Sequence, residues 1–162
     1  MGSTPYRFLS HPHHYRSLEG YQHLYKVRCL VNNTTVDEKV DLPTGFCLIG
    51  ENIKSRDPDI RASIAYLKSR EVDINDIWKF SLGTAKTGTY RRRIIFPSFD
   101  IDGDLNYFVA RSIDANSKRK YVNARLKKSQ IIFNEYLINW KKELVLVEGP
   151  FDLIKAPENS VC

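Results

Sequence analysis

An acidic residue stands directly after an apolar run close to the end of this sequence. Residues 144–147 read Leu-Val-Leu-Val, Glu148-Gly149 follow, and the next residues predict the start of a helix. Buried strands of open α/β sheets end in this way, and such sheets bind their ligands at the carboxyl ends of the strands. A glutamate there can serve as a general base or help to hold a divalent cation, so Glu148 is a candidate catalytic residue. We expect Asp152 either to cap the helix or to point into the same crevice.

Positive charge is the second feature that suggests chemistry, and it is concentrated in residues 84–128. This segment holds eleven Lys or Arg against four Asp, a net charge of +7; the whole chain carries +6, so the remainder carries −1. A basic segment in an otherwise nearly neutral protein suggests a polyanionic partner. A lysine-rich solvated surface would give the same charge count and stays open as the alternative.

Arginine, tyrosine and asparagine occur in the basic segment in a combination that suits nucleic acid. Residues 91–93 are three arginines, and on one strand Arg91 and Arg93 would share a face while Arg92 takes the other. Arginine binds phosphates through its bidentate fork, and tyrosine and arginine stack on exposed bases. The candidate ligands of single-stranded nucleic acid or nucleoside triphosphate are Arg91, Arg93, Arg111, Lys120, Tyr121 and Asn123. An edge strand protected by charge is the alternative interpretation.

Two helices are predicted before the basic segment. Asp57 is a favourable N-cap, and Pro58 suits the first helical position. The apolar face of this helix is expected to consist of Ile60, Ile64 and Leu67. A second, shorter helix begins after Asp73. Its expected apolar side consists of Ile74, Ile77 and Trp78.

A β-hairpin is predicted for the basic segment itself. Residues 93–97 and 105–111 are rich in strand-forming residues, and they flank a turn at Asp102-Gly103. The elements predicted after the hairpin are an extended piece at residues 120–123, a helix over residues 133–140 and a buried strand over residues 143–147.

Other metal sites are not supported by the spacing of the residues. In the acidic run 100–104, glycine would occupy the fourth position of a calcium loop and arginine the twelfth, whereas an EF-hand needs glycine sixth and glutamate twelfth. Three cysteines without CxxC spacing predict neither a zinc site nor a disulfide framework, and they favour a reducing compartment. The histidines at 11–14 have no second ligand cluster at a suitable spacing. Because neither a membrane span nor a secretory signal is visible, we expect a cytoplasmic protein.

Seven motifs, in their order along the chain, resemble bacterial-type DNA primases in a phage-like version. They are AYLKSR at 65–70, FSLG at 80–83, RRRIIFP at 91–97, YFVAR at 107–111, KYVNA at 120–124, IFN at 132–134 and VEGPFD at 147–152. The resemblance covers residues 42–162. It implies an α+β chain: a small mixed helix and β-hairpin basic subdomain, followed by the first strand and helix of an α/β Toprim fold. The implied divisions are a poorly assigned N-terminal extension (1–41), the N-terminal basic subdomain of the RNA polymerase region (42–142) and the start of the Toprim domain (143–162).

The resemblance also implies roles for individual residues. The residues implied to line a groove for template, primer or nucleotide phosphates are Arg91, Arg93, Arg111 and Lys120, with Tyr121 and Asn123 in support. Glu148 would be the Toprim glutamate of a metal-assisted phosphoryl transfer, so Mg²⁺ or Mn²⁺ is expected in the complete enzyme. The Toprim aspartates and the usual preceding zinc-binding domain are missing from this sequence, so we expect the fragment to be inactive alone.

The partners implied are a single-stranded DNA template, an RNA primer and nucleoside triphosphates, with a replicative helicase as a further candidate and no membrane. Val109 and Ala110 stand where two glycines are usual, and Pro150 where an aromatic residue is common, which suggests a divergent phage lineage acting in the host cytoplasm. Two alternatives remain: a non-catalytic module that binds single-stranded nucleic acid, and another Toprim enzyme such as a topoisomerase or nuclease.

Overall fold

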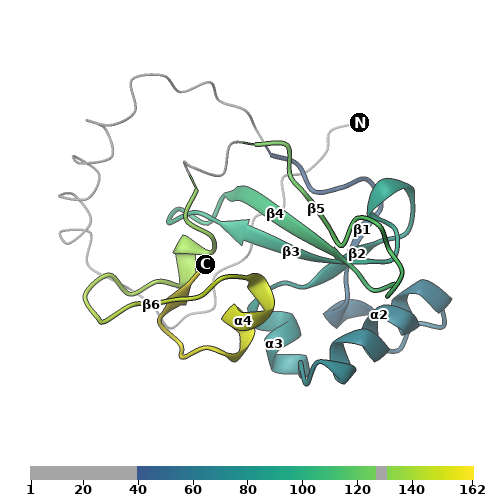
Figure 1. Ribbon diagram of the computed structural model, residues 1–162, viewed down its shortest axis with the longest axis horizontal. Coiled ribbons are helices and arrows are strands. Elements are labelled where there is room, and N and C mark those ends of the chain that lie inside the picture. Colours follow the sequence, from purple (N-terminus) through teal and green to yellow (C-terminus); the bar gives the residue numbers. More distant parts are fainter. Residues whose placement is uncertain (1–39, 127–130) are drawn as a thin grey trace. The chain divides into compact units, whose positions relative to one another are not determined.

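The computed structural model describes residues 40–126 and 131–162. A five-stranded antiparallel sheet, in the order β1-β2-β3-β4-β5, forms the centre of this region (Figure 1). Its strands are β1 (Phe46–Leu48), β2 (Gly83–Ala85), β3 (Arg93–Phe99), β4 (Leu105–Ser112) and β5 (Tyr121–Asn123). The helices are α2 (Pro58–Ser69), α3 (Ile74–Lys79) and α4 (Pro150–Lys155). The predicted α+β class is confirmed, and the part of the Toprim fold named with it is considered below as a proposal.

The hairpin and the extended piece predicted for the basic segment are confirmed as β3, β4 and β5. In β3 and β4, Arg93 lies opposite Ser112 and Ile94 opposite Arg111, while Arg111 also lies opposite Tyr121 of β5. The turn contains Gly103 at φ 85°, a left-handed conformation that glycine adopts without steric cost. The sheet therefore sets basic and aromatic side chains at a fixed spacing.

Helix α2 begins and ends as its sequence predicts. The Asp57 carboxylate accepts hydrogen bonds from the backbone N–H groups of Asp59 and Ile60, and Pro58 takes the first position. Ile60 and Leu67 are fully buried, and Ile64 packs against the core. The apolar face predicted for this helix is confirmed.

Helix α3 is confirmed, but its predicted apolar side is only partly correct. Asp73 and Asp76 form a reciprocal capping box, which explains why the helix starts there. Ile77 is buried, whereas Ile74 and Trp78 are more than 40% exposed. A helix of six residues buries a narrow stripe, and here the stripe is centred on Ile77.

The helix predicted over residues 133–140 is wrong. Only Glu135–Leu137 form a single 3-10 turn (η5), and Asn134 has a left-handed φ of 57°. The backbone N–H of Asn134 donates to the buried Ser98 hydroxyl instead of continuing a helix. Asn159 donates from its side chain to the carbonyl of Asn139 and so fixes an irregular path there. Local side-chain hydrogen bonds thus override the apolar period.

The strand predicted at residues 143–147 exists only as β6 (Val145–Leu146), and it is not buried. It pairs in parallel with β7 (Ser160–Val161), and α4 connects the two. Val145 is 38% exposed and Leu146 is 79% exposed. A parallel strand is buried when layers cover both of its faces; within the part of the chain that the structure describes, β6 has β7 as its one paired neighbour.

The core lies between the sheet and the helices, which in Figure 1 are drawn on one side of β3 and β4. Its largest fully buried side chains include Phe96, Ile94 and Ile95 of β3, together with Ile49 and Leu82. Among residues 40–126 and 131–162, no helix combines the length and the apolarity that crossing a membrane requires.

Candidate nucleic-acid interface

Arg111 is the centre of a cluster of cationic and aromatic side chains. Its Nε donates to the Tyr66 hydroxyl oxygen at 2.8 Å, and a second guanidinium nitrogen donates to the Tyr121 hydroxyl. Its guanidinium carbon lies 5.0 Å from the centre of the Tyr121 ring and 5.6 Å from that of Phe151. Burial lowers the pKa of Arg111, but the hydrogen bonds to both tyrosines outweigh this effect, and the pKa is raised. The cluster brings β4, β5, α2 and α4 together.

Arg70 is a member of this cluster that the sequence analysis did not single out. Its guanidinium carbon lies 4.9 Å from the centre of the Phe151 ring and 5.5 Å from that of Tyr66. Phe151 also makes an edge-to-face contact with the buried Phe96 of β3. Arg70 belongs to a motif that suggested the family resemblance, but its aromatic partners are far away in the sequence. Its contacts could not be inferred from spacing.

Arg93 is buried, with 8% of its surface exposed, and its guanidinium is used within the protein. Nε donates to the Thr89 carbonyl at 3.1 Å, while Nη1 donates to the carbonyls of Arg119 at 3.0 Å and Lys120 at 3.3 Å. Burial lowers the pKa of this group. Arg93 therefore holds the segment that precedes β5 against the start of β3.

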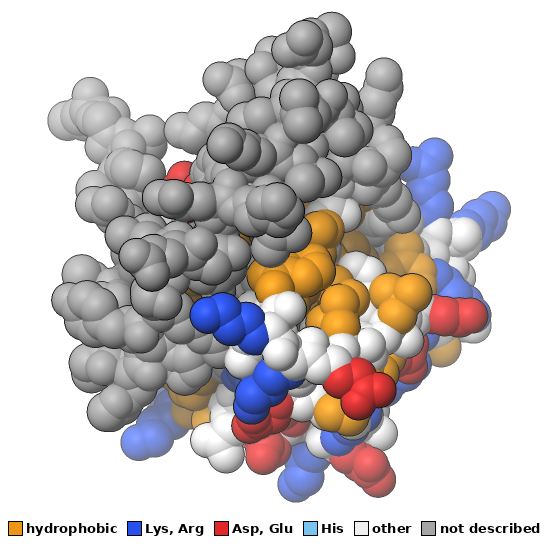
Figure 2. Space-filling view, turned by 90° about the vertical axis from the view of Figure 1, so that its left-hand side faces the viewer, with side chains coloured by type: hydrophobic (Ala, Val, Ile, Leu, Met, Phe, Trp, Pro, Cys, Tyr) orange, Lys and Arg blue, Asp and Glu red, His pale blue; other side chains and the backbone are white. Residues whose placement is uncertain are grey.

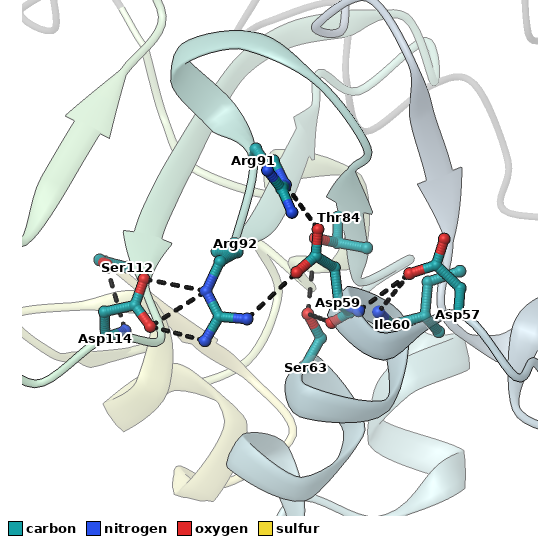
Figure 3. Close-up of polar contacts among 9 residues, drawn as sticks. All are labelled: Asp57, Asp59, Ile60, Ser63, Thr84, Arg91, Arg92, Ser112 and Asp114. Atoms are coloured by element: carbon teal, nitrogen blue, oxygen red, sulfur yellow. Dashed lines mark hydrogen bonds and ion pairs between the residues drawn. The ribbon is translucent and has the colours of Figure 1, made fainter.

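The prediction that residues 91–93 alternate across one strand is wrong. Strand β3 begins at Arg93, and Arg92 has a left-handed φ of 55°, so the extended backbone of the strand does not include Arg92. As a result, Arg91 and Arg92 both bind Asp59 in the first turn of α2, whereas Arg93 is buried and donates to backbone carbonyls. Figure 3 shows Arg91 and Arg92 converging on Asp59.

Two carboxylates occupy the guanidinium groups of Arg91 and Arg92. Arg91 Nε lies 2.6 Å from one oxygen of Asp59, and Arg92 Nη1 lies 3.1 Å from the other. Arg92 also binds Asp114. Its Nη2 lies 2.7 Å from one carboxylate oxygen of Asp114, and its Nε lies 3.1 Å from each of the two oxygens. Hydrogen bonding to Arg91 lowers the pKa of Asp59, and hydrogen bonding to Arg92 lowers that of Asp114.

Lys120, Tyr121 and Asn123 lie at the outer strand β5. Lys120 is exposed, and Tyr121 is 43% exposed despite its contact with Arg111. The side-chain oxygens of Asn106 and Asn123 are buried and have no hydrogen-bond donor among the described residues. Such an acceptor is costly unless a partner outside these residues satisfies it. The unsatisfied oxygen of Asn123 thus belongs to the same strand as the exposed Tyr121 ring, and the exposed Lys120 directly precedes that strand.

Glu148 lies where the sequence predicts it, after the C-terminal end of β6 and just before α4, and it is exposed. Pro150 takes the first position of α4, and Leu153 and Ile154 bury one side of the helix. Phe151 anchors α4 to Arg70 and Arg111, which fixes the turn at Glu148 relative to the sheet. Asp152 is in the first turn of α4, where a carboxylate complements the helix dipole.

The described residues do not fit a complete divalent-cation site. No group of three or more His, Cys, Asp or Glu side chains that could hold a metal occurs in residues 40–126 and 131–162. Glu148 offers one exposed carboxylate at the carboxyl end of β6. The histidines at 11–14 and nearly all of the N-terminal extension lie outside the described residues.

The charge on the surface is mixed rather than uniformly positive. Figure 2 shows the face on the left of Figure 1, where the described Lys and Arg side chains lie among Asp, Glu and exposed apolar side chains. Exposed apolar residues of the molecule include Tyr136, Val145 and Leu146. The predicted positive segment is therefore divided among ion-paired, buried and exposed side chains.

No protein-family model matches the chain. A DNA primase of Mycoplasma genitalium is 31% identical over 146 residues, which is 83% of this chain and 23% of that protein. The chain thus spans about a quarter of the length of the curated relative that it matches.

Solved structures share the fold. A DnaG primase catalytic domain bound to single-stranded DNA matches with a TM-score of 0.56 and 17% identity, covering 70% of this chain and 53% of that one. The zinc-binding and RNA polymerase domains of the Aquifex aeolicus primase match with a TM-score of 0.55 and 24% identity. This match covers 70% of this chain and 39% of that one. A third match is the RNA polymerase domain of Mycobacterium tuberculosis DnaG, in complex with a double-stranded DNA that has a 6-nucleotide overhang. Its TM-score is 0.53 and its sequence identity 20%, and the match covers 65% of this chain and 46% of that one. The chain is therefore a relative of the DnaG-type DNA primases, and its described residues have the fold of part of the primase RNA polymerase domain, the catalytic core.

Proposed function

We propose that this chain is the part of a DNA primase that holds a single-stranded template beside the site of RNA primer synthesis. The observation that carries the proposal is the arrangement at β4 and β5, where an exposed tyrosine ring stacks on a guanidinium next to an exposed lysine. Stacking surfaces next to cations suit single strands, because bases offer π-faces and the backbone offers phosphates. The relatedness to primases supports the same function.

Each candidate residue has a role within this proposal. Tyr121 and Arg111 form the stacking surface, and Lys120 pairs with a backbone phosphate. Asn123 supports this surface from within β5, where its side-chain oxygen is buried and lacks a donor among the described residues. Arg93 acts from inside the protein. It donates hydrogen bonds to the backbone carbonyls of Arg119 and Lys120 and so positions the segment that leads into β5. Arg91 is a further phosphate ligand once its carboxylate partner is displaced.

Glu148 connects the template surface to the reaction. We propose that residues 143–162, with their parallel β6–α4–β7 arrangement, are the start of a Toprim domain that follows the basic subdomain 42–142. Glu148 then supplies one carboxylate to a site for Mg²⁺ or Mn²⁺ in the complete enzyme, and the other ligands come from outside the described residues. Nucleoside triphosphates and the RNA primer are the corresponding substrates.

The remaining parts of the proposal concern biological context. A replicative helicase is a candidate partner and the cytoplasm the proposed compartment. The departures at Val109, Ala110 and Pro150 from the usual primase motifs support a phage-like lineage acting in a host cell.

Binding of the purified chain to a fluorescein-labelled oligothymidylate of about 20 nucleotides tests the template function. Fluorescence anisotropy should show binding that weakens steeply with salt, because each released counterion contributes to the slope. The double variant Lys120→Ala, Tyr121→Ala should bind at least about tenfold more weakly, since base stacking alone is worth about 1–3 kcal/mol.

Lys54→Ala is the matched control, because Lys54 is an exposed lysine outside β3, β4 and β5. It should lower affinity only slightly. Equal effects of Lys54→Ala and Lys120→Ala would show that binding depends on net charge alone and would contradict the proposed surface. Arg93→Ala is unsuitable for this test, because it would remove a buried guanidinium that donates to three backbone carbonyls within the protein.

A further inference from the structure

The ion pairs at the start of β3 form a compact network with an asymmetric distribution of exposure. Arg91 is 57% exposed and Arg92 is 39% exposed, whereas the Asp59 side chain that joins them is only 14% exposed. Figure 3 shows Asp59 between the two arginines. Asp114, the second carboxylate partner of Arg92, is 47% exposed, so Asp59 is the shielded anion of the network. A ligand that approaches this surface meets Arg92 with all three guanidinium nitrogens bound to carboxylates, and Arg91 with its Nε bound to Asp59.

Carboxylate and phosphate oxygens compete for the same donors. Guanidinium groups bind both in a bidentate way through the planar fork. Asp59 offers one oxygen to each arginine, so it bridges them as a phosphate could bridge them. Asp114 fills the rest of the fork of Arg92. In this geometry the carboxylates stand where nucleic-acid phosphates would bind.

The backbone shows that this placement is built into the chain. Arg92 has a left-handed φ of 55°, which a residue with a side chain adopts at a cost in free energy. That conformation turns its guanidinium away from the strand and toward Asp59 and Asp114. Asp59 is itself held in place, because its backbone N–H donates to the N-cap Asp57.

We propose that Asp59 is an internal competitor of nucleic-acid phosphate, which keeps Arg91 and, together with Asp114, Arg92 out of the binding surface until a strand displaces it. This inference rests on the proposed function and adds a regulator of affinity to it. The carboxylates lower the resting affinity for single strands and confine tight binding to strands already held at Tyr121 and Lys120. Because exposed ion pairs contribute little to stability, a phosphate held nearby can open them.

The test compares Asp59→Asn with the unchanged chain in the oligothymidylate assay at several salt concentrations. Asparagine keeps the size of the side chain and removes its charge, so Arg91 becomes free to pair with a phosphate. One additional contact to a single strand should steepen the salt slope by about 0.7 and raise affinity by about fivefold at 0.1 M salt. In the Asp59→Asn background, Arg91→Ala should abolish the gain, because the gain depends on the guanidinium that the loss of the carboxylate sets free.

Asp76→Asn is the matched control, because Asp76 also lies in the first turn of a helix and its change alters net charge equally. It should give no gain in affinity beyond its small effect on net charge. Asp114→Asn is a second variant that leaves α2 untouched, and it should give a smaller gain, since Arg92 keeps its contact with Asp59. Circular dichroism verifies that each variant is folded.

The outcomes separate the two proposals. If the unchanged chain binds the oligothymidylate and Asp59→Asn gains no more affinity than Asp76→Asn, Asp59 is not a competitor of phosphate. The proposed template function is then unaffected. A gain in Asp59→Asn that persists when Arg91→Ala is added also overturns the competitor, because the freed Arg91 guanidinium would then not be the source of the gain. Absence of binding by both the unchanged chain and Asp59→Asn overturns the template function and the competitor with it.

Discussion

Arg111 and Tyr66 are joined by a hydrogen bond of 2.8 Å between strand β4 and helix α2, 45 residues apart in the sequence. The same guanidinium contacts Tyr121 on the neighbouring strand, so one side chain fixes both the helix and the outer strand to the sheet. The stacking surface proposed for nucleic acid is therefore supported from behind by Tyr66.

Tyr66→Phe should destabilise the protein through this bond alone. The ring and its contact with Phe151 remain, but a half-buried guanidinium loses its hydroxyl acceptor. A hydrogen bond to a charged group is worth about 1.5–3 kcal/mol, so urea denaturation should show a loss of that order in the free energy of unfolding. Tyr136→Phe, at a residue 56% exposed, is the control and should change stability little. Equal stability of both variants would contradict the supporting role of Tyr66.

Gly83→Ala should be strongly destabilising. A Cβ at this position would lie 2.1 Å from the Phe46 ring and 2.8 Å from the Cys47 carbonyl oxygen, so β1 and β2 would have to separate. Overpacking of this kind costs about 1–3 kcal/mol, and thermal unfolding should reveal it. Gly149→Ala is the control, because its Cβ would meet only the Asp152 carboxylate at 3.5 Å. A stable Gly83→Ala protein would show that β1 is easily displaced.

Glu71→Gly should stabilise the protein. Glu71 follows α2 with a left-handed φ of 56°, where its N–H donates to the Lys68 carbonyl and ends the helix. Glycine adopts this conformation without the steric cost of a Cβ. The gain in stability is reduced in part, because glycine also raises the conformational entropy of the unfolded chain. We expect a net gain of about 1 kcal/mol, measured by chemical denaturation. Glu71→Ala retains the Cβ and should give no such gain.

Acid should weaken the protein partly through Asp59 and Asp114. The arginines lower the pKa of both carboxyl groups from 3.8, so their stabilisation is complete above the unfolded pKa and is lost as the pH falls through the folded pKa. The difference in unfolding free energy between the unchanged chain and Asp59→Asn should therefore shrink between about pH 5 and pH 2. A difference that stays constant over this range would show that Asp59 titrates normally.

The elements that sequence predicts well are those with local signals. Asp57-Pro58 and Asp73 define the starts of α2 and α3, and the turn at Asp102-Gly103 predicts the hairpin, because capping and turn chemistry act over a few residues. The helix predicted over residues 133–140 was wrong for the complementary reason. Ser98 and Asn159 are distant in sequence, and they form hydrogen bonds with this segment that a helical period cannot reveal.

The sequence names candidate residues for the site, but it does not give their geometry. Arg111 lies opposite Tyr121 on the neighbouring strand, and Glu148 follows the end of a strand. Arg70 and Asp59 could not be found, since their partners lie on other elements. The strand before Glu148 was expected to be buried because its residues are apolar, but burial depends on covering layers that composition does not specify.

The left-handed conformation at Arg92 has a consequence for sequence alignment. Three identical neighbours occupy three different environments, so a gap placed one position away in this triplet exchanges a buried donor for an exposed, ion-paired one without changing the apparent match. Comparisons of homologues should therefore align this segment by the hydrophobic register of β3, beginning at Ile94, and only then compare its arginines.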